Sequence, residues 1–268
     1  MPRFNHSTIN FNYRDMGEGV PFVFQHGLGG DVRQPCGLLQ PPAGIRLIAL
    51  DCRAHGETRP LGPKGKIGIA SFADDLGALL DHLEIERAVV GGISMGAAVA
   101  INFALRQPER VLGLVQSRPA WLEGPNHENS RLFVRIAQLL RDHGPSRGRE
   151  IFCDSEIYQQ VSADAPDSAA SLAGHFDNEQ AVERSIRLDR IPLDSPYKRL
   201  DELSAIDVPT IVLANRQDPI HPFQYGQIIG QKIPTAEFRE LTPKSVSADQ
   251  HAEDVQRLLA EFLGKHFA

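Results

Sequence analysis

The 268-residue sequence contains only three cysteines, Cys36, Cys52 and Cys153, and no CxxC pair. An odd and scattered set favours free thiols in a reducing compartment over a disulfide framework. The sequence also lacks any run of about 18 apolar residues, so no membrane-spanning helix is predicted. Its first residues do not form a basic segment followed by an apolar one, the order that is typical of a signal peptide. Together these absences predict a cytoplasmic protein.

The sequence has no excess of positive charge. Its 28 Lys and Arg face 34 Asp and Glu, a formal net charge of −6, which excludes a basic surface for nucleic acid or an anionic membrane. The ten histidines are dispersed, without an HExxH or paired His/Cys spacing, so no metal site is predicted. We therefore expect a small-molecule substrate and no cofactor. The sequence gives no indication of the oligomeric state.

Apolar runs alternate with helical patterns along much of the chain. Residues 8–13 alternate as an exposed strand would, and compact apolar runs that predict buried strands occupy residues 21–25, 45–50, 87–93, 111–116, 210–214 and 236–241. Helices are predicted between them, one of them capped by Ser71 and a last one from about residue 248 to 263. This alternation is typical of a mostly parallel central sheet flanked by helices, an α/β fold.

The alternation is interrupted once. Residues 121–205 have a helical pattern with loops and no convincing strand, and residues 131–141 give the clearest helix. We therefore predict a core formed by residues 1–120 and 206–268, with residues 121–205 as an inserted helical cap.

The pentapeptide Gly92-Ile93-Ser94-Met95-Gly96 matches G-x-S-x-G and lies between a predicted strand and a helix of small residues. A serine on a sharp strand-to-helix turn needs neighbours without side chains, which Gly92 and Gly96 provide. This turn places Ser94 at a helix N-terminus, where free N–H groups favour developing negative charge. The pattern predicts Ser94 as a nucleophile, and the alternative is a serine that only caps the helix.

Four segments in order resemble those of the α/β-hydrolase superfamily, and the resemblance covers essentially the whole chain. They are His26-Gly27-Leu28-Gly29-Gly30, Asp51-Cys52-Arg53-Ala54-His55-Gly56, the Ser94 pentapeptide and Asp218-Pro219. The resemblance implies an α/β-hydrolase fold with a cap. It also implies an oxyanion hole formed by the backbone N–H groups of Leu28 and Met95.

Asp218 is the expected acid of a catalytic triad. It follows the apolar run 210–214, the place where the superfamily keeps the residue that orients its histidine. The other site, after the run 111–116, offers Ser117 and Arg118 but no carboxylate. Arg118 is expected to form a salt bridge with the cap or, as the alternative, to meet a substrate carboxylate.

The sequence departs from the superfamily pattern at the catalytic base. The stretch after the last predicted strand, residues 241–246, contains no histidine. His251 shares one helix face with Val255 and Phe262, so we assign it as the base. His221, three residues after Asp218, is the alternative. Lys244 lies near the usual histidine position, where it would bind a substrate anion or serve as an unusual base with a lowered pKa.

Substrate contacts are less well specified by the sequence. Trp121, the only tryptophan, either packs on a ligand or anchors the cap. His221 and Lys244 are further candidates for substrate binding. His26 is a weaker one, because this histidine and His55 are expected to support the loops around them.

The combined prediction is a metal-free serine hydrolase, a carboxylic ester hydrolase in type, with Ser94, His251 and Asp218 as its triad. A small ester or lactone is the expected substrate, and cleavage of a carbon–carbon bond in a diketone uses the same groups. Two alternatives remain open: a ligand-binding or receptor-like homologue with little turnover, and a cofactor-free perhydrolase similar to haloperoxidases.

Overall fold

The computed structural model describes residues 2–125, 127–178 and 180–267. An eight-stranded sheet with the order β1-β2-β4-β3-β5-β6-β7-β8 forms its centre. The strands are β1 (Arg3–His6), β2 (Ile9–Gly17), β3 (Val20–Gln25), β4 (Ile45–Leu50), β5 (Ala88–Ile93), β6 (Val111–Ser117), β7 (Thr210–Ala214) and β8 (Ala236–Glu240). From β4 to β8 every neighbouring pair is parallel, while β2 runs antiparallel to both β1 and β4. This confirms the predicted fold class.

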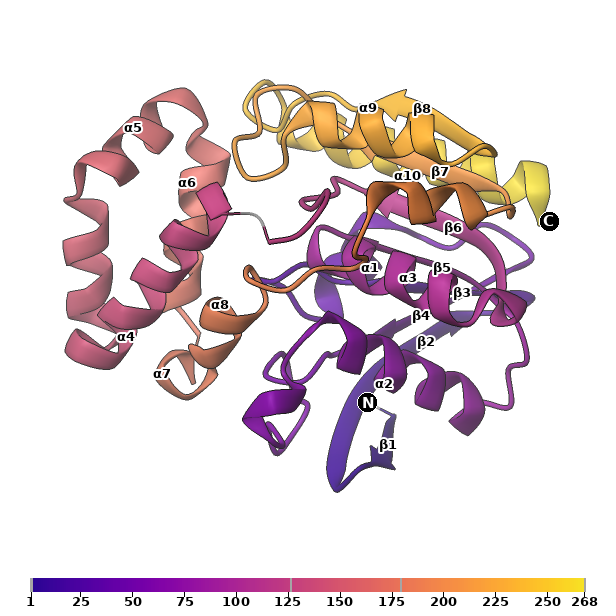
Figure 1. Ribbon diagram of the computed structural model, residues 1–268, viewed down its shortest axis with the longest axis horizontal. Helices are drawn as coiled ribbons and strands as arrows, with labels where there is room; N and C mark the ends of the chain where they lie inside the picture. Colours follow the sequence, from indigo (N-terminus) through magenta and orange to yellow (C-terminus); the bar gives the residue numbers. More distant parts are fainter. Residues whose placement is uncertain (1, 126, 179, 268) are drawn as a thin grey trace.

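Helices cover both faces of the sheet (Figure 1). They are α1 (Arg33–Leu38), α2 (Ile69–His82), α3 (Met95–Arg106), α9 (Phe223–Lys232) and α10 (Ala248–His266). One apolar core contains residues of α2, α3 and α9, and a second core, on the other face, contains Val255, Leu259 and Phe262 of α10. β5 is buried along its whole length between these layers, as parallel central strands are.

The chain leaves the sheet after β6 and returns at β7. Between these strands lie α4 (His127–Cys153), α5 (Glu156–Asp164), α6 (Pro166–Ala173), α7 (Ala181–Arg184) and α8 (Ile186–Arg190). These helices form a separate layer at the left of Figure 1, beside the end of the sheet where β6 finishes. We call this layer the cap and retain 121–205 as its proposed limits.

Two local predictions were wrong. The segment predicted as an exposed strand is the buried part of β2, because β2 pairs on both sides and Phe11 and Tyr13 enter the core. Ser71 does not cap the helix that contains it. That helix, α2, begins at Ile69, whose N–H donates to the carboxylate of Asp194 over 2.7 Å. The carboxylate of Asp194, from a distant segment, takes the place of a local N-capping side chain. No local sequence pattern reveals such a contact.

Candidate active site

Ser94 lies at the turn between β5 and α3 and has φ 56° and ψ −109°. Its N–H donates to the carbonyl of Ser117 at the end of β6 over 2.9 Å, which fixes the turn against the neighbouring strand. A side chain on Gly92 would overlap the backbone of Gly96, and one on Gly96 would overlap the carbonyl of Gln25. The spacing of the two glycines therefore has the predicted steric cause. The positive φ is a strained backbone conformation of the kind that proteins keep at functional sites.

The loop after β3 lies beside this serine. A Cβ on Gly27 would stand 3.6 Å from the Cβ of Ser94, and Gly30 N–H donates to the Gly27 carbonyl over 2.9 Å to close a tight turn. Within the described part of the chain, the N–H groups of Leu28 and Met95 have no hydrogen-bond partner. These are the two donors that the predicted oxyanion hole requires.

His26 and His55 support this loop from beneath. The Nδ1–H of His26 donates to the Gly27 carbonyl over 2.8 Å, and its Nε2 accepts from the N–H of Cys52 over 3.1 Å. His55 places Nε2 3.0 Å from the carbonyl oxygen of Leu28. Both rings are fully buried, and burial lowers the pKa of each. Because both His26 nitrogens are occupied inside the protein, we no longer place this residue among the substrate contacts.

Asp218 follows β7 and is buried. Its Oδ1 accepts from the N–H groups of Ile220 and His221, and its Oδ2 lies 2.8 Å from Nδ1 of His221 and 3.3 Å from a guanidinium nitrogen of Arg118. Although burial opposes ionisation, His221 and Arg118 hold the pKa of Asp218 well below its usual range. The expected salt bridge from Arg118 to the cap was wrong, since this arginine pairs with Asp218.

His251 is buried in the first turn of α10, as the helix periodicity predicted. Its Nδ1–H donates to the carbonyl of Thr242 over 2.8 Å. Among the described residues, the imidazole partner of Asp218 is therefore His221 and not His251. The cause is local: the turn that follows Asp218 folds His221 onto its carboxylate, while the nearest acceptor for His251 is the chain just after β8. Burial, together with Arg118 and Lys244, lowers the pKa of His251 to about 4.

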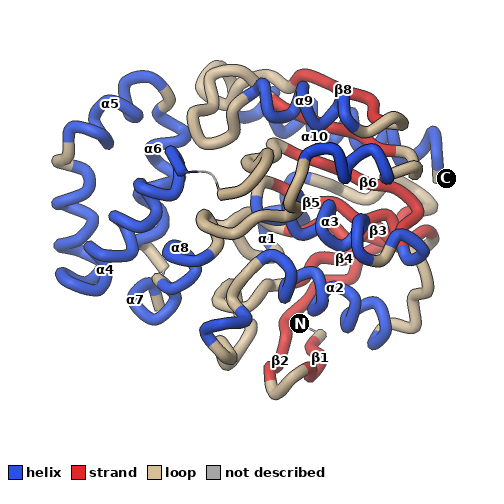
Figure 2. The backbone as a smooth tube through the Cα atoms, viewed as in Figure 1, coloured by secondary structure: helices blue, strands red, loops and turns tan. Residues whose placement is uncertain are grey.

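Lys244 lies in the loop after β8 and is half-buried. Its ammonium forms no hydrogen bond or ion pair in the part of the chain that the structure describes. Burial and the charge of Arg118 lower its pKa to about 8, against the opposing effect of Asp167 and Asp218. The four neighbouring parallel strands β5, β6, β7 and β8 are thus followed by Ser94, Arg118, Asp218 and Lys244, which places these residues at one end of the sheet. The cap helices lie beside the sheet at that end (Figure 2).

The cap contributes three buried groups near this end of the sheet. Trp121 is buried and packs in the main core, which favours its role as an anchor, and its indole N–H is unpartnered in the described structure. His175 and Arg187 were not singled out in the sequence. A Cβ on Gly29 would lie 3.3 Å from the ring of His175. No local motif marks a cap residue of this kind, because the contact joins segments about 150 residues apart.

The structure also bears on metal sites, membrane-spanning helices and disulfides. Over the described ranges, no three His, Cys, Asp or Glu side chains are grouped so that they could hold a metal ion. No helix in those ranges has the length and apolar character needed to cross a membrane. The three cysteines are free thiols.

Comparison with known proteins agrees with the fold described above. A family model described as alpha/beta hydrolase fold matches residues 20–252. The AB hydrolase superfamily protein YisY of Bacillus subtilis is 26% identical over 92% of this chain and 93% of its own. Two solved structures each have a TM-score of 0.74 and 22% identity over 98% of this chain. They are the enol-lactonase of Burkholderia xenovorans, covered over 100% of its length, and a thermophilic esterase of Thermogutta terrifontis, covered over 99%. This chain belongs to the alpha/beta hydrolase family.

Proposed function

We propose that the protein is a serine hydrolase that cleaves a small ester or lactone through an acyl-enzyme on Ser94. The observation that carries this proposal is the positive-φ turn that holds Ser94 at the N-terminus of α3, next to Gly27 and the free N–H groups of Leu28 and Met95. A serine that served only as a helix cap would not need this strained turn. Its hydroxyl also forms no cap hydrogen bond.

In the proposed reaction, Ser94 Oγ attacks the carbonyl carbon and its proton passes to an imidazole. The N–H groups of Leu28 and Met95 stabilise the oxyanion, by about 3 kcal/mol for each donor. The leaving alkoxide takes this proton from the imidazole as the carbon–oxygen bond breaks. Water then attacks the acyl-enzyme and gives a proton to the same imidazole, which passes it to Ser94 Oγ as the bond from Oγ to the acyl carbon breaks and the acid is released. No metal or redox group is needed to balance either step.

We keep His251 as the proposed base. The carbonyl of Thr242 fixes its Nδ1–H, so that Nε2 is the nitrogen left to accept a proton. Asp218 then supports the site through its negative charge. His221, which the same carboxylate orients directly, is the second candidate for the base.

Hydrolysis of p-nitrophenyl acetate and of a short lactone tests the proposal. We expect turnover by the wild-type protein and a loss of about 10³-fold or more in kcat for Ser94→Ala. His251→Ala and His221→Ala, measured side by side, identify the base, since loss of a general base costs about 10²- to 10⁴-fold. Hydrolysis that Ser94→Ala retains would contradict the proposal.

A ligand-binding protein with little turnover is the second candidate. It is favoured by one observation: the carboxylate–imidazole pair of the site, Asp218 and His221, does not include the histidine on α10. In that case Ser94→Ala would bind ligand as tightly as the wild type, and neither protein would release p-nitrophenol.

A further inference from the structure

Arg187 is a buried cation that no carboxylate neutralises. It is 3% exposed, and among the described residues its guanidinium forms one hydrogen bond, from a terminal nitrogen to the carbonyl of Ala54 over 2.9 Å. Its Nε is buried without a partner, and no acidic side chain in the described structure lies within ion-pair distance. A buried charge without a counter-ion is costly to fold, so proteins keep one where an anion binds.

His175 is a second unsatisfied group beside it. The ring is 4% exposed and packs edge-on against Phe133, and its Nδ1 is buried without a hydrogen-bond partner in the described residues. Burial and the charge of Arg187 lower the pKa of His175 to about 3, so the ring is neutral and offers one N–H donor at physiological pH. Arg187 binds the carbonyl of Ala54, and His175 lies over Gly29. These two loops meet where Nε2 of His55 lies 3.0 Å from the Leu28 carbonyl oxygen.

His175 faces the loop that carries the proposed oxyanion hole, and Arg187 faces the neighbouring loop after β4. The ring of His175 lies over Gly29, next to Leu28, and Arg187 holds the carbonyl of Ala54 in the loop after β4. Arg187 also lowers the pKa of His26 and His55, the two histidines that support the loop. The guanidinium therefore lies at the seam between the cap and the floor of the proposed site.

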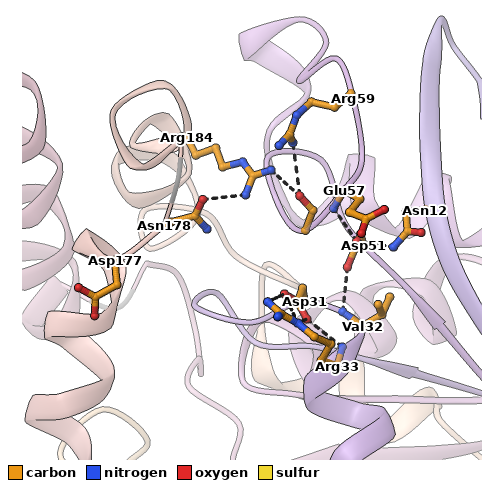
Figure 3. A pocket seen from close by; sticks show the side chains of 11 residues that line it. Asn12, Asp31, Val32, Arg33, Asp51, Glu57, Arg59, Asp177, Asn178 and Arg184 are labelled. Carbon is orange, nitrogen blue, oxygen red and sulfur yellow. Dashed lines mark hydrogen bonds and ion pairs between the residues drawn. The ribbon is translucent and has the colours of Figure 1, made fainter. Parts of the chain in front are cut away.

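The neighbouring arginine, Arg184, forms more hydrogen bonds at this seam than Arg187, although its Nε is also buried without a partner in the described structure. Arg184 donates to the side chain of Asn178 and to the carbonyl of Gly56 (Figure 3). It borders a cavity of about 490 Å³ in which Arg33 and Asp31 form a bidentate ion pair. The charges around that cavity largely neutralise one another, which gives it no preference for a charged ligand. Burial lowers the pKa of Arg184, but the charges of Asp51, Glu183 and Asp31 raise it. Burial and the charge of Arg184 both lower the pKa of Arg187, and no carboxylate in the described structure opposes them.

We propose that Arg187 and His175 form a subsite that binds a carboxylate on the substrate, on the cap side of the oxyanion loop. The guanidinium Nε and free Nη donate to the carboxylate oxygens, and the imidazole N–H donates to one of them or to a neighbouring oxygen. The inference rests on the proposed function and narrows its substrates to esters or lactones that carry a carboxylate.

Matched esters test the subsite. We expect the wild-type protein to hydrolyse mono-p-nitrophenyl succinate, glutarate or adipate with a higher kcat/KM than p-nitrophenyl butyrate. Arg187→Met lowers the ratio of the two kcat/KM values by about 10- to 100-fold, mainly through KM, and Arg187→Lys restores part of it. The control is Arg190→Met on the same helix, whose side chain also joins the cap to the core by donating to the Ile67 carbonyl. Its ratio stays at the wild-type value.

Two results would overturn the subsite. One is a wild-type protein with no preference for any of the three carboxylate esters. The other is an equal loss for both kinds of ester in Arg187→Met, which would assign Arg187 to docking of the cap.

Binding of succinate, glutarate and adipate to Ser94→Ala, measured by calorimetry, separates the subsite from the proposed chemistry. If Ser94 proves inert but Arg187→Met abolishes this binding, the subsite stands and the hydrolase proposal fails. If Ser94 is reactive and none of the three diacids binds, the hydrolase proposal stands and the subsite fails. Arg187→Lys provides the folded comparison if Arg187→Met does not fold.

Discussion

Two buried imidazoles, those of His221 and His251, are each held in one tautomer by a hydrogen bond at Nδ1. For His221 the partner is the Asp218 carboxylate, and for His251 it is the Thr242 carbonyl. In both rings Nε2 is then the nitrogen that accepts a proton. Burial lowers the pKa of both imidazoles, that of His251 to about 4, and it lowers the pKa of the Lys244 ammonium to about 8.

The pH dependence of hydrolysis follows from these values. A base must be unprotonated to act, so activity falls as the pH drops through its pKa. If His251 is the base, kcat/KM stays level from pH 7 to about 5 and falls near pH 4, where its pKa lies. A fall centred near pH 8 would instead identify Lys244. Profiles of His251→Ala and Lys244→Met serve as the controls.

A buried ion pair away from the site provides a prediction about stability. Arg53 and Asp75 form a bidentate pair with distances of 2.6 Å, and both are buried. Asp75→Asn leaves the guanidinium without its counter-charge, so we expect a loss of about 3–5 kcal/mol in the free energy of unfolding. Urea unfolding measures it. A loss below 1 kcal/mol, with Arg53 still buried, would contradict this account.

Much of the site could be predicted from single residues, but their pairing could not. The motifs located Ser94 and Asp218, because each follows a recognisable strand at a fixed spacing. The partner of Asp218 depends on how the turn after β7 folds and on Arg118 reaching across from β6. No sequence motif marks Arg187. Its distinguishing feature is that no carboxylate in the described structure lies within ion-pair distance, and only the folded structure reveals this.

At the scale of elements, the turn from β5 to α3 is the most constrained part of the fold. Gly96 packs directly on the carbonyl of Gln25 in β3, so this helix can approach the sheet only without a side chain there. Strand β1 was not predicted and β2 extends beyond its predicted end, whereas β3 to β7 could be predicted nearly to the residue, because burial on both faces requires continuous apolar runs. The start of α2 could not, because its first N–H is satisfied by Asp194 from the segment after the cap helices.

Gly96→Ala tests the constraint on this turn. The added Cβ overlaps backbone that cannot move away, so we expect a loss of about 1–3 kcal/mol in stability together with loss of hydrolysis. Gly264→Ala in α10 is the matched control, because nothing lies within 4 Å of the added carbon. That change should stabilise the protein by about 0.5–1 kcal/mol. Thermal and urea unfolding compare the two, and equal effects would contradict the packing argument.

At the scale of the whole molecule, buried neutral histidines occur in the cap, in the loops after the strands and on the last helix. Burial lowers the pKa of five of them, which are His26, His55, His175, His221 and His251. The unfolded chain takes up protons at these rings below about pH 6.5, while the folded chain does not. Lowering the pH from 7 therefore favours the unfolded state.

We expect the free energy of unfolding to be at least about 2 kcal/mol lower at pH 5 than at pH 7. His175→Gln removes one titrating ring and should make the dependence less steep. Urea unfolding at the two pH values provides the measurement. Stability that is equal at both, or higher at pH 5, would show that these rings are not held neutral in the folded protein.

The central claim is that Ser94 is an activated nucleophile. The most direct test is to treat the purified protein with a fluorophosphonate and locate the adduct by peptide mapping, with Ser94→Ala as the control. Our account predicts one adduct for each chain, on Ser94, and none in the variant. A folded protein that remains unlabelled, or is labelled at another residue, would contradict it.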